Sequence, residues 1–139
     1  MHERDHNTSW VVDLTRWPFV SIRPPSSGPE EDGELTQFYH ALEHLFSRRR
    51  PYAVLYDVRG VFISASRRDR MTEWTSRNDS SIRTHMIALA VVVSSETERA
   101  QVMAGFWSLK QSYHARIFES PAEAEHWLLA EFARGEGAN

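Results

Sequence analysis

The sequence predicts an α/β fold: one domain with a mixed, mostly parallel sheet, an N-terminal antiparallel strand pair and the order β-β-α-β-α-β-α-β-α. Short apolar runs alternate with amphipathic segments along the 139 residues, which is typical of a parallel sheet covered by helices. Hydrophobic residues make up 41% and charged residues 25% of the chain, close to the globular average. We place the domain at residues 10–132, between disordered segments at 1–9 and 133–139.

The N-terminal part of the domain contains two predicted strands and one helix. Residues 10–14 (WVVDL) and 19–23 (FVSIR) are rich in β-branched and aromatic residues and flank a Trp-Pro break, so we expect them to pair antiparallel. After a turn-forming stretch, residues 34–49 carry apolar residues at helical spacing. This stripe consists of Leu35, Phe38, Leu42, Leu45 and Phe46.

Two apolar runs predict the centre of the sheet. Residues 52–57 (YAVLYD) and 87–93 (IALAVVV) have the continuous hydrophobicity of parallel strands buried on both faces, and the first is expected in the middle. Between them, residues 66–78 predict a weaker helix with Ser66 as its N-cap. Only Met71 and Trp74 anchor this helix, so we expect it to be lightly attached.

The C-terminal part continues the alternation. Residues 96–113 predict a helix and residues 115–118 (ARIF) a short strand. The pair Ser120-Pro121 suits a helix start, with serine as cap and proline in the first position. The two helices would bury Val102, Phe106, Leu109 and Tyr113, and Ala124, Trp127, Leu128 and Phe132, respectively.

Composition narrows the classes of function. The chain has no cysteine, which rules out disulfides and thiolate chemistry. Its polar start and the lack of a long apolar run predict neither a signal peptide nor a transmembrane segment, and we expect a cytoplasmic protein. The net charge is -3 and the pI about 6.2, so we expect no nucleic-acid partner. The positive charge is arginine-rich and gathers in the middle third, at Arg48, Arg49, Arg50, Arg67, Arg68, Arg70, Arg77 and Arg83.

The chain resembles the SpoIIAA-like proteins of the STAS and Sec14-like group. The resemblance spans residues ~10–132 and rests on the order of elements, on AVLYDVRGV (53–61) and IALAVVV (87–93), and above all on RIFESPAEAEHWL (116–128). It implies a small mixed sheet with helices and a role in regulatory protein binding or apolar ligand binding.

One departure from that group concerns its phosphorylation switch. In its anti-sigma-factor antagonists the switch serine stands in an Asp-Ser-Ser-Gly-like setting after the central strand, whereas this chain has VFISASRRDR, with Ser64 and Ser66 nearby but no such aspartate or glycine. A phosphate on Ser66 would lie at a helix N-terminus among Arg67, Arg68 and Arg70. The alternative is that Ser66 only caps the helix.

Enzyme signatures are weak. His40 and His44 share one helix face at metal-ligand spacing, but that face points away from the apolar stripe, and we expect surface histidines and no metal. The sequence contains no GxSxG elbow, P-loop or GxGxxG, so we expect no cofactor. Asp57 ends the central strand, where α/β proteins often bind ligands, although it equally suits a cap of the next turn.

Three hypotheses follow. The first is a non-enzymatic regulatory module in which Ser64 to Arg77 meets an acidic protein partner. The second is a carrier or sensor of a small apolar or lipid-like ligand, with Met71 and Trp74 at the mouth of a pocket and arginines at its rim. The third is an enzyme that uses Asp57 with a loop histidine such as His85. The edge strand at 10–14 also offers a surface for a homodimer.

Overall fold

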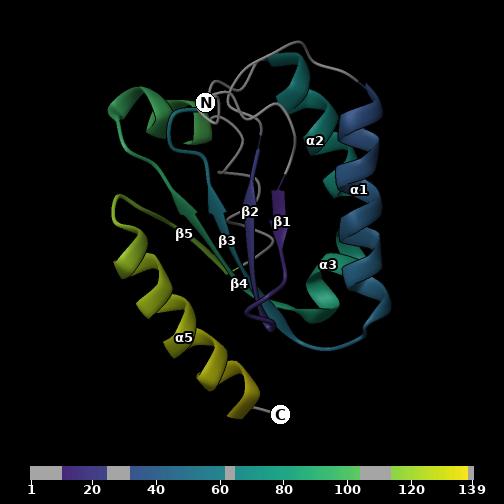
Figure 1. Ribbon diagram of the computed structural model, residues 1–139, viewed down its shortest axis with the longest axis vertical. Coiled ribbons are helices and arrows are strands. Elements are labelled where there is room, and N and C mark those ends of the chain that lie inside the picture. The colour runs from purple at the N-terminus through teal and green to yellow at the C-terminus, as the bar shows by residue number, and fades with distance from the viewer. Residues whose placement is uncertain (1–10, 25–31, 62–64, 104–113, 138–139) are drawn as a thin grey trace, which may run out of the picture.

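A five-stranded mixed sheet forms the centre of the computed structural model, which describes residues 11–24, 32–61, 65–103 and 114–137, with the backbone alone at 32–38, 67 and 136–137 (Figure 1). The strands lie in chain order, β1-β2-β3-β4-β5. β1 pairs antiparallel with β2, and every later pair is parallel. The strands are β1 (Val11–Asp13), β2 (Phe19–Arg23), β3 (Tyr52–Asp57), β4 (Met86–Val92) and β5 (Ala115–Phe118).

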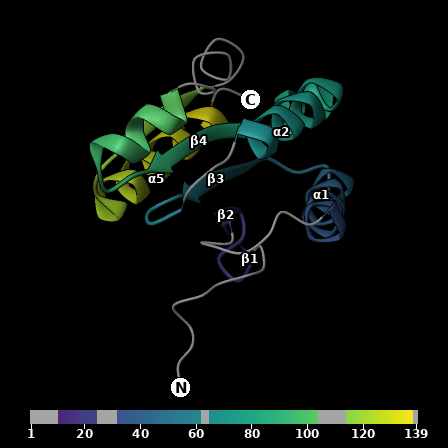
Figure 2. The same ribbon diagram turned by 90° about the horizontal axis from the view of Figure 1, so that it is seen from above.

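Helices cover both faces of this sheet. α1, α2 and α3 lie together on one side (Figure 1), and both views place α5 on the side opposite α1 and α2 (Figures 1 and 2). A further helix begins at Glu96 and is described as far as Met103. The labelled helices are α1 (Asp32–Ser47), α2 (Ala65–Arg77), α3 (Asp79–His85) and α5 (Pro121–Gly137).

The predicted fold class is confirmed: the chain has the antiparallel β1–β2 pair, a parallel remainder and β3 in the middle. The predicted bounds of β2, β3 and β5 agree with the structure. The helix α3 was not predicted because Ile82 is the one buried residue in its short sequence DSSIRTH. His85, expected in a loop, therefore ends a helix.

Two predicted features differ from the structure, one at the start of α2 and one at the end of α5. The prediction of Ser66 as N-cap is wrong, since α2 begins at Ala65 and Ser66 is already helical. The disordered tail predicted from residue 133 is wrong for residues 133–137, which continue α5. Two contacts hold this last turn: Arg134 pairs with Glu131 at 2.8 Å, and Gly135 lies so close to the sheet that an added Cβ would be 2.8 Å from Ile87 Cγ2.

The side chains of the sheet form one core on each face because successive residues of a strand point to opposite sides. The α5-face core contains Ala53, Ala88, Ala90, Val92, Phe118, Ala124, Leu128 and Phe132. The opposite core contains larger side chains, among them Val20, Ile22, Tyr52, Val54, Leu89 and Val91, and Val102 packs against it. Trp74 and Ile82 form a third cluster between the helices.

Candidate functional site

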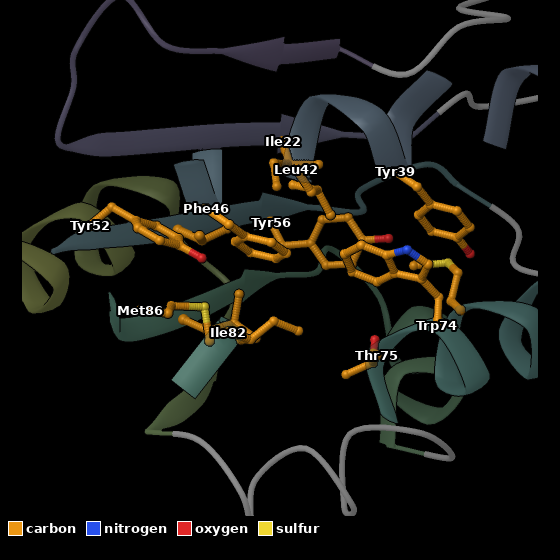
Figure 3. Close-up of a pocket in the computed structure, with 13 residues that line it drawn as sticks. Ile22, Tyr39, Leu42, Phe46, Tyr52, Tyr56, Trp74, Thr75, Ile82 and Met86 are labelled. Atoms are coloured by element: carbon orange, nitrogen blue, oxygen red, sulfur yellow. The ribbon is translucent and has the colours of Figure 1, made fainter. Parts of the chain in front are cut away.

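A pocket of about 130 Å³ lies on the α1–α3 face of the sheet. We call it the aromatic pocket, because five of the residues that line it have aromatic rings (Figure 3). Six elements contribute to its wall, so it exists only in the folded chain. The lining residues are Ile22, Tyr39, Leu42, Phe46, Tyr52, Val54, Tyr56, Met71, Trp74, Thr75, Ile82, Met86 and Leu89.

Trp74 connects α2 to the rest of the pocket. Its ring stacks on Tyr39 of α1, with the centroids 4.6 Å apart and the planes 4° apart, and lies 6.1 Å from Phe46. Its side chain is 6% exposed, so Trp74 forms part of the wall rather than an open mouth. Met71, one turn earlier on the same side of α2, is half-buried and lines the pocket as well. The structure thus brings together the two anchors predicted for this helix.

The described lining of the pocket is electrically neutral at physiological pH. Among the described residues that line it, none has a charged side chain. Burial raises the pKa of Tyr52 to about 12, so its hydroxyl keeps its proton. The pKa of Tyr39 is also raised: burial raises it, more strongly than the nearby charges of Arg70 and Arg77 lower it. A buried charge without a partner is costly, and a neutral group therefore suits this interior.

Arginines flank Trp74 along α2. Arg70 precedes Trp74 by four residues and Arg77 follows it by three, which places both on the same side of the helix. Arg70 and Arg68 are half-buried and Arg77 is exposed. Ser66 is exposed at the start of α2. Ser64 and the side chain of Arg67 lie outside the described residues.

A second hollow, of about 220 Å³, lies on the α5 face and is called the polar groove. Its charged side chains already have partners: Arg16 lies 3.6 Å from Glu125, and Asp13 accepts hydrogen bonds from Thr15. Its wall consists of Asp13, Arg16, Phe19, Val20, Ser21, Leu55, Asp57, Arg59, Pro121, Glu125, Leu128 and Leu129.

Asp57 is part of an ion-pair network at the carboxyl edge of the sheet. Arg59 donates to both of its carboxylate oxygens, at 2.9 and 2.8 Å, and Arg23 of the neighbouring strand lies 3.2 Å away. Burial raises the pKa of Asp57, but the hydrogen bonds and charges of the two arginines together bring it below its ordinary value. These contacts support the interpretation of Asp57 as a structural cap of the turn that follows β3.

A second carboxylate strengthens the same edge. Glu98 accepts backbone hydrogen bonds from Gly60, after β3, and from Ser94, after β4, both at 2.7 Å. It therefore ties together two loops that follow neighbouring strands. Burial raises the pKa of Glu98 and these hydrogen bonds lower it, with the net result below its ordinary value.

His85 does not join Asp57. His85 precedes β4, whereas Asp57 pairs with Val92 at the other end of that strand, so the two are about 20 Å apart at a rise of ~3.3 Å per residue. His114 lies 2.7 Å from Glu131 beside α5. His40 and His44 are exposed on α1. Within the part of the chain that the structure describes, no three His, Asp or Glu side chains gather into a metal-binding group.

Sequence reasoning identified two residues of the aromatic pocket and missed most of the others. Tyr39 lies beside the predicted α1 stripe rather than in it, and Tyr52 and Tyr56 were assigned to a strand buried on both faces. The alternation along β3 places Tyr52, Val54 and Tyr56 on one face, a signal that could have grouped them. Their meeting with α2 depends on tertiary packing, which no local pattern encodes.

Comparisons with known proteins return nothing for this chain: no protein-family model, curated protein or solved structure matches it. Across the described ranges, no helix combines the length and the apolar character required to cross a bilayer.

Proposed function

We propose that this protein is a binding module without catalytic activity that holds a small apolar ligand in the aromatic pocket. The observation that carries the proposal is the pocket itself, an apolar space of about 130 Å³ under α2 with no charged side chain among its described lining residues. A buried apolar cavity of about 150 Å³ engineered in another protein stays dry and binds benzene. The volume therefore suits one ring or a short chain rather than a whole lipid.

The polar groove supports this function less well, although it is larger. A ligand there would compete with ion pairs that the protein already makes, at Arg16–Glu125 and around Asp57. In the aromatic pocket a ligand would instead supply contacts that the wall lacks, and each buried methylene is worth about 0.8 kcal/mol. The separation of Asp57 from His85 is a further argument for binding rather than catalysis.

Native mass spectrometry of the purified full chain, before and after denaturation, tests whether a ligand co-purifies. Toluene and indole then serve as defined probes in a thermal unfolding assay, since a ligand at 100 times its Kd stabilises the folded state by about 2.7 kcal/mol. We expect Val54→Ile, which adds a methylene to the pocket wall, to weaken the binding of both probes. We expect Leu129→Ala, which removes an exposed side chain of the polar groove, to leave it unchanged.

The opposite pattern, with Leu129→Ala weakening binding and Val54→Ile having no effect, would assign the probes to the polar groove. No stabilisation by either probe, together with a native mass equal to that of the bare chain, would contradict ligand binding.

A second candidate function is a regulatory protein-interaction module of the STAS type. The mixed sheet is consistent with that resemblance, and the basic helix α2, with exposed Arg77 and half-buried Arg68, supports an acidic protein partner. If this is the function, a co-purifying protein should dissociate when Arg67 and Arg68 are both changed to Glu. If no protein co-purifies with the parent chain, the same two changes have no bound protein to release and should not alter the assembly state of the chain.

A further inference from the structure

We propose that the ligand of the aromatic pocket is a small aromatic acid, with its ring in the pocket and its carboxylate at Arg77. This inference rests on the proposed function and adds the chemical class of the ligand. It follows from the contrast between a neutral interior and a basic rim.

The side chains that line the pocket favour a ligand with an aromatic ring. Tyr39 and Trp74 stack with their planes 4° apart, and Phe46 lies nearly parallel to Trp74 at 20°. Aromatic rings attract one another in offset-stacked or edge-to-face arrangements beyond the effect of buried area. Met71 and Met86, whose thioethers adapt to irregular shapes and favour aromatic edges, complete the wall. A planar ring therefore fits both the volume and the chemistry of this space.

The arginines that flank Trp74 favour a ligand with a negative charge. Arg70 and Arg77 flank Trp74 on its own side of α2, one turn before and one turn after it. Both lie close enough to the Tyr39 hydroxyl for their charges to lower its pKa against the stronger effect of burial. Within the described residues, no ion pair involves Arg77, and its exposed guanidinium suits a two-pronged contact with a carboxylate.

The opposite charge is disfavoured at the same place. The negative charge of Glu73 raises the pKa of Tyr39, but it does so less than the charge of either Arg70 or Arg77 lowers it. An ammonium group bound to the same ring would meet the exposed charge of Arg77 and no carboxylate among the described lining residues of the interior. A neutral alcohol would meet neither attraction nor repulsion.

Three probes with one ring and a similar short chain test this directly: phenylacetate, 2-phenylethanol and 2-phenylethylammonium. Binding to the full chain is followed by the indole N–H signals of Trp74 and Trp127 in a proton–nitrogen correlation spectrum. Trp127 packs on the α5 face and serves as an internal reference. We expect all three probes to shift the Trp74 signal, with the anion binding three- to tenfold more tightly than the alcohol at low salt, and the cation most weakly.

Two arginine variants separate charge from packing. Arg77→Gln should bring the affinity for phenylacetate to within about twofold of that for 2-phenylethanol, and the affinity for the alcohol should not change. Arg116→Gln is the matched control, since it removes the same charge from an exposed residue that lies over Phe118 of the α5-face core, and it should leave the preference intact.

If the alcohol binds as tightly as the anion, or if Arg77→Gln leaves the preference unchanged, the inference is wrong while the proposed function stands. If none of the probes shifts Trp74 at millimolar concentration, both are wrong. A shift of Trp127 without one of Trp74 would place binding on the other face and also overturn the inference.

Discussion

The two faces of the sheet are built from the same strands and yet pack in opposite ways. On the α5 face, Ala53, Ala88 and Ala90 are fully buried, and α5 lies close against them through Ala124. On the other face, the residues that alternate with these alanines are large, and large rings from α1 and α2 meet them. Small side chains let a helix approach closely, and none of these three alanines lines the polar groove on the same face. Stacked rings are too rigid to interdigitate fully, and the aromatic pocket is left between them.

The largest expected effect is the loss of an aromatic ring from the well-packed face. Phe132→Ala should lower the free energy of unfolding by about 3–5 kcal/mol, as for other buried phenylalanines, because Phe132 is 8% exposed and its ring lies 5.3 Å from that of Phe19. Phe46→Ala, the matched change at the pocket, should cost about half as much, since Phe46 is half-buried and borders empty space. Urea denaturation measures both, and equal losses would mean that the two faces are packed alike.

The pocket face should also lose stability in alkaline solution. Tyr52 has a pKa of about 12 in the folded chain and an ordinary value of 10.0. The folded state holds this proton more tightly than the unfolded state. The contribution of the neutral tyrosine to the free energy of unfolding is therefore complete below pH ~10 and is lost as the pH rises toward ~12, by an amount on the order of 3 kcal/mol.

The matched variant for this prediction is Tyr52→Phe, which keeps the ring and removes the titrating hydroxyl. Its free energy of unfolding, measured by denaturant titration from pH 8 to pH 12, should fall less steeply than that of the parent chain. Curves of equal slope for the two proteins would show that the ionisation of Tyr52 does not govern alkaline stability.

The contrast between the faces explains what the sequence could predict. Strands were located from local hydrophobic runs, and two-residue alternation then distributes Ala53 and Val54 to opposite faces. Most of the α5-face core could be predicted from the sequence, since Ala124, Leu128 and Phe132 repeat at helical spacing. The pocket could be predicted only in part, through Met71 and Trp74, because its volume depends on how side chains from three helices, with rings from α1 and α2, meet the sheet. Helix α3 has one apolar anchor, which is too few for hydrophobic periodicity to indicate a helix.

The smallest expected effects come from slightly enlarging one side chain on each face. Ala90 is fully buried against α5, so Ala90→Val should lower the free energy of unfolding by about 1–3 kcal/mol through overpacking. Val54 faces the aromatic pocket, so Val54→Ile should be neutral or stabilising by up to ~0.8 kcal/mol, the value of one buried methylene. Opposite signs for the two changes, measured by the same denaturation assay, would show that the pocket is real free volume. Destabilisation of similar size by both would mean that the rings already fill it, and that a ligand would have to move α2 in order to enter.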